Sequence, residues 1–219
     1  RAVQGIALVS LAQRFGGVLG ALVAGVTLTW WGTAMTFVVM ATCYSTGACV
    51  MYALRRQGVA APTVREPIRQ NLLTYLRALR TNQDVRMLMF STAAAELFGF
   101  SHQVMLPILA KEVLHIGAGG LGVLTAFRFL GGVLGASALT WIGVIQRRGR
   151  MLLGTLVLFG AGQVLLAYAP TFWSAAVCVI YINIMASATD VLHQTLLQSS
   201  VANEQRGRAM GSWIIGTGI

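Results

Sequence analysis

The chain has 219 residues, of which 56% are hydrophobic, 10% are charged and 25 are glycine. Soluble proteins carry roughly 25% charged residues, so this composition excludes a water-soluble domain, which needs a polar surface. Helices that face lipid need no such surface. The 3 cysteines lie in apolar stretches, which excludes a disulfide scaffold. The composition predicts an all-α integral membrane protein.

The net charge of +10 raises the question of a nucleic-acid partner. A nucleic-acid surface is a clustered basic patch, whereas the arginines here occupy short segments between apolar runs. The positive-inside rule of membrane proteins explains that distribution better. We therefore expect the lipid bilayer as a partner and no nucleic acid.

Six apolar runs in the chain are long enough to cross a membrane, and a seventh begins near residue 209. A spanning helix needs about 20 apolar residues. The first two runs are separated by an uncharged turn at Trp30 to Thr33. The six lie at about 6–29, 33–54, 87–110, 119–143, 151–169 and 171–195. The sequence predicts a polytopic bundle of six transmembrane helices and part of another.

The basic residues alternate between the predicted loops. Lys111 lies on one side beside Glu112, and Arg14 and Arg128 fall within spans. The other 13 of the 16 basic residues lie on the opposite side, namely Arg1, Arg55, Arg56, Arg65, Arg69, Arg77, Arg80, Arg86, Arg147, Arg148, Arg150, Arg206 and Arg208. Since positive loops face the cytoplasm, we expect the first residue and the central loop to be cytoplasmic.

The central connection, about residues 55–86, contains a pattern typical of an amphipathic helix. Ile68, Leu72, Leu76 and Leu79 recur at helical spacing, and Pro67 suits a first turn. The pattern predicts a helix lying along the cytoplasmic headgroups. The alternative is a solvated linker helix.

Glycines four residues apart occur in three spans. Small residues at this spacing let helix backbones approach closely in lipid. We expect the three helices to form a close or sliding interface, and the alternative is that glycine is simply frequent in membrane helices. The pairs are Gly16 with Gly20, Gly131 with Gly135, and Gly207 with Gly211.

Several stretches match motifs of a known family of membrane proteins. They are Gln13-Arg14, Leu106-Pro107, Gly119-Gly120-Leu121-Gly122, Arg147-Arg148-Gly149-Arg150 and Arg206-Gly207-Arg208-Ala209-Met210-Gly211. Together they resemble the major facilitator superfamily of secondary transporters over essentially the whole chain. The Arg147 to Arg150 stretch resembles that family's cytoplasmic signature loop, with Gln146 in place of an aspartate and Ile142 in place of a glycine. The first span lacks the proline of the exporters' fifth-helix signature.

The resemblance implies a partial major facilitator fold. Residues 1–54 would end an N-terminal six-helix half, 55–86 would be the cytoplasmic linker, and 87–219 would hold helices seven to ten and the start of eleven. It also implies that Gly16, Gly20, Gly131, Gly135 and Gly211 lie where the two halves meet.

By resemblance, the chain is similar to bacterial multidrug and siderophore exporters of the inner (plasma) membrane. We expect proton-coupled efflux by a protein that is a monomer when complete, with no cofactor and no metal. The alternatives are an uptake symporter of the same fold, a membrane receptor or assembly subunit, and an intramembrane enzyme. The last is disfavoured because no nucleophile with its base and no metal-ligand spacing occurs.

Four ionisable residues lie inside predicted spans: Arg14, Glu96, Arg128 and Asp190. Each costs about 2.5–3.5 kcal/mol at a helix centre, so we expect them to face one another or water.

Two spans carry polar residues along one helix face. Residues spaced by three and four lie on the same side of a helix, so two such stripes predict two walls of an aqueous cavity. The stripes are Thr92, Glu96, Gly99 and Gln103 in the third span, and Asn183, Ser187, Asp190 and Gln194 in the sixth.

Glu96 falls near the middle of its span, and we interpret it as a proton-carrying or substrate-contacting group. The alternative is a structural ion pair with Arg128 or another arginine. Asp190 fits transport and a helix-packing salt bridge equally. Arg14 is interpreted as an interface anchor or a contact for a substrate anion, and Arg128 as a cavity or pairing residue.

Two histidines, His102 and His193, also fall inside spans. We favour hydrogen-bonded packing roles for both. Asp190 and His193 lie one helical turn apart, but two ligands alone make no metal site.

Overall fold

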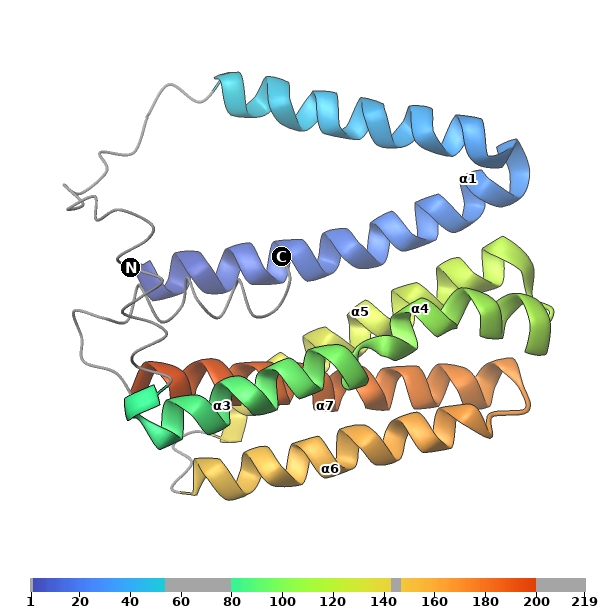
Figure 1. The fold of residues 1–219 in the computed structure, drawn as a ribbon. Helices are drawn as coiled ribbons and strands as arrows, with labels where there is room; N and C mark the ends of the chain where they lie inside the picture. Colours follow the sequence, from blue (N-terminus) through green and yellow to red (C-terminus); the bar gives the residue numbers. More distant parts are fainter. Residues whose placement is uncertain (1, 54–79, 143–146, 200–219) are drawn as a thin grey trace.

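The computed structural model describes residues 2–53, 80–142 and 147–199, and these ranges are helical apart from short turns. Five of their helices are long and apolar enough to cross a membrane. Residues 33–53 diverge from the other helices, which run side by side as a bundle (Figure 1). The prediction of an all-α transmembrane bundle is confirmed.

The first helix, α1 (Ala2–Ala53), is bent sharply at Gly32. Gly32 has φ 76° and ψ −177°, a region of backbone conformation that is essentially restricted to glycine. The hydroxyl of Thr36 donates to the Gly32 carbonyl at 3.0 Å and lies 3.2 Å from the hydroxyl of Thr27. Figure 1 shows the two legs of α1 diverging from this bend, which confirms the predicted turn at Trp30 to Thr33.

The third predicted span is a helix interrupted by two π-helical turns. It consists of α3 (Gln83–Ala94), the π-turn η1 (Ala95–Gly99), α4 (Ser101–Ile108) and the π-turn η2 (Leu109–Val113). Pro107 lies inside α4, and a proline removes one helical hydrogen bond. The predicted span of 87–110 is in place, and the two π-turns inside it were not predicted.

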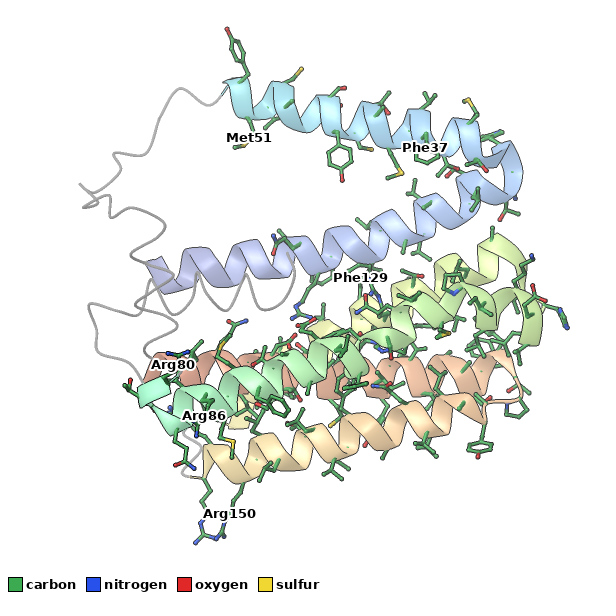
Figure 2. All side chains as sticks on the ribbon, in the orientation of Figure 1. Phe37, Met51, Arg80, Arg86, Phe129 and Arg150 are labelled. Atoms are coloured by element: carbon green, nitrogen blue, oxygen red, sulfur yellow. The ribbon has the colours of Figure 1, made fainter. Side chains whose placement is uncertain are left out.

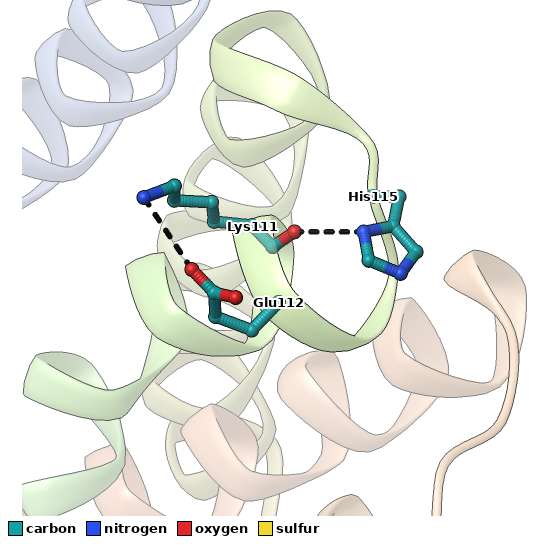
Figure 3. Close-up of polar contacts among 3 residues, drawn as sticks. All are labelled: Lys111, Glu112 and His115. Atoms are coloured by element: carbon teal, nitrogen blue, oxygen red, sulfur yellow. Dashed lines mark hydrogen bonds and ion pairs between the residues drawn. The ribbon is translucent and has the colours of Figure 1, made fainter.

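The chain turns back after η2 through a short polar segment. Lys111 Nζ and Glu112 Oε1 lie 3.4 Å apart, and His115 Nδ1 lies 3.0 Å from the Lys111 carbonyl (Figure 3). His115 and Gly117 have φ angles of 52° and 62°. These left-handed residues reverse the chain and start α5 (Gly117–Ile142).

The last two described helices are α6 (Arg148–Ala167) and α7 (Phe172–Ser199). Because α6 begins at Arg148, three residues of the predicted signature loop form its first turn: Arg148, Gly149 and Arg150. Arg147 is the residue that precedes the helix. The predicted amphipathic helix from Pro67 to Leu79, the span from about 209 and the glycines Gly207 and Gly211 lie outside the described residues.

The helices pack in the order α1, α5, α7, α6. The first leg of α1 contacts α5, α5 contacts α7, and α7 contacts α6. The main core lies where α4, α5, α6 and α7 meet, around Leu124, Phe159, Val179 and Ile182. A smaller core around Leu139, Leu152 and Leu192 lies nearer the end that bears Arg80, Arg86 and Arg150 (Figure 2). Large apolar side chains that stay exposed suit a lipid environment.

Candidate functional site

Asp190 lies within electrostatic range of two of the other three intramembrane charges. Asp190 on α7 interacts with Glu96 on η1 and with Arg14 on α1. Within the described ranges, the only ion pair with a nitrogen to oxygen distance of 4.0 Å or less is Lys111 with Glu112. Arg14, Glu96 and Asp190, called the charge cluster below, therefore form an open arrangement and not a closed salt bridge.

Glu96 belongs to the π-turn η1. The turn closes through the amide of Phe100, which donates to the Ala95 carbonyl at 3.2 Å, five residues back. The amide of Gln103 donates to the Phe100 carbonyl at 3.0 Å, three residues back, instead of to the Gly99 carbonyl as in an α-helix. π-turns inside α-helices are frequent at functional sites, and this one carries a membrane carboxyl.

Side chains take up the carbonyl that the π-turn leaves free. His102 Nδ1 donates to the Gly99 carbonyl at 2.8 Å, and Gln163 Nε2 on α6 donates to it at 2.8 Å. The ring of Phe159 on α6 packs directly against Gly99, where no side chain fits. The shape of η1 is thus fixed by α6, a neighbour distant in sequence.

Arg14 lies across the contact between α1 and α5. Its Nη1 atom rests against Gly132, at the point where any side chain would stand. One turn earlier on α5, Phe129 packs against Gly17 of α1. Gly17 and Gly132 thus leave room for a ring and a guanidinium group between the helices, so that Arg14 reaches α5 from α1.

Arg128 is separate from the charge cluster. Its guanidinium carbon lies 4.7 Å from the centre of the Phe129 ring, and its charge interacts with His102. Among the described residues, no carboxylate lies within 4.0 Å of it. An ion pair between Glu96 and Arg128, one of the alternatives from the sequence, is therefore not formed in this part of the chain.

The polar stripe on α7 divides into different environments. Asn183 is buried, and its Nδ2 donates to the Val179 carbonyl of its own helix at 2.9 Å. Ser187 is buried next to it along the stripe, and its hydroxyl has no hydrogen-bond partner among the described residues. Gln194 on α7 and Gln103 on α4 are half-buried.

The glycines make two kinds of helix contact. Gly25 of α1 meets Gly122 of α5 backbone to backbone, and a side-chain carbon on Gly122 would lie 2.7 Å from Gly25 Cα. Gly131 and Gly135 instead pack against carbonyls of α7, at Ile180 and Ile184. Gly16 and Gly20 have open space beside them in the described structure. The α1 and α5 contact expected from the glycines exists, and Gly25 and Gly122 make it.

Ser91 and His193 form a polar contact that the sequence analysis missed. Ser91 Oγ on α3 lies 2.8 Å from His193 Nε2 on α7. The one signal for it is the spacing of His193, a single helical turn after Asp190. Nothing in the sequence around Ser91 indicates its partner.

Within the described ranges, no group of three or more His, Cys, Asp or Glu side chains gathers as metal ligands would.

Comparison with known proteins identifies the family. Neither the search of curated proteins nor the search of solved structures returned a match. The sequence model of the Major Facilitator Superfamily matches residues 2–219, a range that includes every helix described above. Members of that family are transporters. The chain therefore belongs to the major facilitator superfamily of membrane transporters.

Proposed function

We propose that the protein is a proton-coupled exporter of a drug-like or siderophore-like small molecule in the bacterial inner membrane, working by alternating access. The supporting observation is the charge cluster, in which Asp190 of α7 interacts with Glu96 of η1 and with Arg14 of α1. An unpaired charge in a membrane helix is costly, and membrane carboxyls commonly mark proton pathways.

The charge cluster can act as a single proton site. With both carboxyls ionised it holds two negative charges and one positive charge, which leaves one net negative charge in the membrane. One proton on Glu96 or Asp190 makes the cluster neutral. Because a neutral cluster is cheaper to enclose than a charged one, proton binding favours a conformation in which the site is shut off from water.

The position of Arg14 couples protonation of the charge cluster to movement of the two halves. Arg14 belongs to α1, whereas Glu96 belongs to η1 and Asp190 to α7. Protonation of Asp190 weakens its attraction to Arg14 of α1, and α1 packs against α5 where Gly25 and Gly122 bring the backbones together. In this proposal α1 and α5 belong to the two halves that rock about the site.

Arg128 and the half-buried amides of Gln103 and Gln194 are assigned to the substrate. Arg128 is the intramembrane charge that lies outside the charge cluster, so it is available for a polar group of an amphiphilic molecule. The arginine-bearing end of the bundle, with Arg80, Arg86 and Arg150 (Figure 2), is assigned to the cytoplasm.

Glu96→Gln in the full-length protein tests the proposal, with Glu112→Gln as the matched control. Glu112 carries the same group at an exposed position beside Lys111. Reconstituted vesicles would receive a pH gradient and one of two probes, a lipophilic cationic dye or an iron-free siderophore. We expect Glu96→Gln to lose at least tenfold in proton-driven transport and Glu112→Gln to match the wild type.

Three results would contradict the proposal. If vesicles with the wild-type protein move neither probe in response to the pH gradient, proton-coupled transport of both substrate classes is ruled out. Proton-linked accumulation in the import direction would replace export with uptake. Unchanged transport by Glu96→Gln would remove this carboxyl from the mechanism.

A further inference from the structure

A hydrogen bond joins two membrane helices one turn away from the charge cluster. Ser91 Oγ of α3 and His193 Nε2 of α7 lie 2.8 Å apart, and Ser91 Oγ also lies 2.9 Å from the Leu88 carbonyl. A carbonyl only accepts, so the serine proton belongs to that bond, and His193 then donates from Nε2 to Ser91. His193 is among the most buried side chains of the bundle, with 2% of its surface exposed.

The same histidine is adjacent to Asp190 on its own helix. Residues three apart on a helix are neighbours on one face, and helical side chains lean toward the N-terminus, so the ring leans toward the turn of Asp190. On the other side of Asp190, Ser187 presents a buried hydroxyl without a partner among the described residues. Ser187, Asp190 and His193 therefore follow one another at intervals of one turn on α7, and they are called the polar column below.

The polar column has a direction. At 1.5 Å per residue, Glu96 is about 20 Å along the third span from its start at Gln83, and Ser91 is about 12 Å along it. His193 is about 9 Å from the end of α7 at Ser199. Both members of the pair thus lie between the charge cluster and the end of the bundle that bears Arg80 and Arg86 (Figure 2).

The elements packed around His193 carry few charged residues. They are Asp84 and Arg86 on α3, Glu96 on η1 and Asp190 on α7 itself, and Arg14 of α1 interacts with Asp190. On α5, Arg128 acts on His102. The sequence of α6 between Met151 and Ala167 contains no titratable side chain. Among the described histidines, His193 is the one that lies a single helical turn from Asp190.

We propose that His193 and Ser91 are the proton exit of the carrier, an inference that rests on the proposed proton coupling. A proton leaves the carboxyl of Asp190 for Nδ1 of His193, which gives a carboxylate and an imidazolium. The imidazolium releases its Nε2 proton to water that reaches Ser91 from the arginine-bearing end. The ring is then neutral, with its proton on Nδ1, and it returns to the Nε2-protonated form when water donates a proton to Nε2 and accepts the one from Nδ1. Charge and proton number balance at each step.

The experiment compares two modes of transport in vesicles that contain the full-length protein. Proton-driven transport needs the relay, whereas exchange of labelled for unlabelled probe across the membrane at equal pH involves no net proton movement. The probes are the same lipophilic cation and iron-free siderophore. The variants are His193→Gln, Ser91→Ala and Ser91→Thr, with His115→Gln as the control. His115 is exposed and follows η2, at the other end of the third span from Arg80 and Arg86.

We expect His193→Gln to lose at least tenfold in proton-driven transport while exchange stays within twofold of the wild type. Ser91→Ala should lose severalfold in the same mode, and Ser91→Thr, which keeps a hydroxyl, should recover most of it. His115→Gln should match the wild type in both modes. If His193 relays protons, its substitution lowers the rate of proton-driven transport but not of exchange. If it only packs the helices, both rates fall together.

Each other outcome counts against the inference. If His193→Gln is as fast as the wild type in both modes, or if both modes fall equally, the pair only holds α3 and α7 together. If His193→Gln does not insert, Ser91→Ala and Ser91→Thr decide by the same comparison. A wild type without proton-driven transport of either probe contradicts the proposed function itself, a result distinct from a coupled wild type whose variants are unaffected.

Discussion

Gly122→Ala places a methyl group between two helix backbones. The new carbon would lie 2.7 Å from Gly25 Cα and 2.8 Å from the Ala21 carbonyl oxygen, whereas ordinary contact begins at 3.4 Å. Neither neighbour is a flexible side chain. The helices α1 and α5 must therefore move apart by about 0.7 Å at this point, the difference between 2.7 and 3.4 Å.

The expected cost follows from two opposing effects. Overpacking of a close contact costs about 1–3 kcal/mol, whereas alanine is better than glycine in a helix by about 1 kcal/mol. We expect Gly122→Ala to lower the free energy of unfolding by roughly 0–2 kcal/mol. Gly160→Ala is the matched control, because Gly160 lies within α6 and has nothing within 4 Å of the added carbon.

The measurement is unfolding of the full-length protein in mixed micelles, with denaturing detergent as the titrant and helical circular dichroism as the signal. Gly160→Ala should gain about 1 kcal/mol from helix propensity. The difference between the two alanine variants isolates the overpacking, about 1–3 kcal/mol. If Gly122→Ala proves as stable as Gly160→Ala, the helices do not meet backbone to backbone at Gly25.

Two further substitutions test the bend and the core by the same unfolding measurement. Gly32→Ala should lower the free energy of unfolding by about 1–3 kcal/mol, because its φ of 76° and ψ of −177° suit only glycine; a neutral result would mean that α1 is not bent there. Phe159→Ala should cost about 3–5 kcal/mol, because the ring is 2% exposed and packs against Gly99 and His102. A loss below 1 kcal/mol would show that the ring does not support the π-turn.

The helices could be predicted from the sequence because hydrophobic length and loop charge are properties of each segment alone. The bend at Gly32 falls inside the predicted turn, and α5 begins and ends close to the predicted 119–143. The boundaries at Arg148 and Ser199 were less accurate, since charged and polar residues continue these two helices beyond their apolar stretches.

The contacts between helices were harder to predict. A four-residue glycine spacing shows that a backbone approaches something, but not which helix it approaches, and Gly131 and Gly135 turn out to face α7. The π-turn at Glu96 depends on Gln163 and Phe159 of α6. No pattern within residues 87–110 contains that information.

The carbonyl of Gly99 has a consequence for the orientation of the carboxyl three residues before it. A π-turn holds one residue more than an α-turn, and each residue of an α-helix corresponds to about 100° of rotation. If the hydrogen bonds from Gln163 and His102 to that carbonyl broke, the π-turn could become an α-turn. The part of the helix before it would then rotate about its axis by about 100°. Glu96 would then point away from Asp190. The π-turn therefore determines which charged group lies near the Glu96 carboxyl.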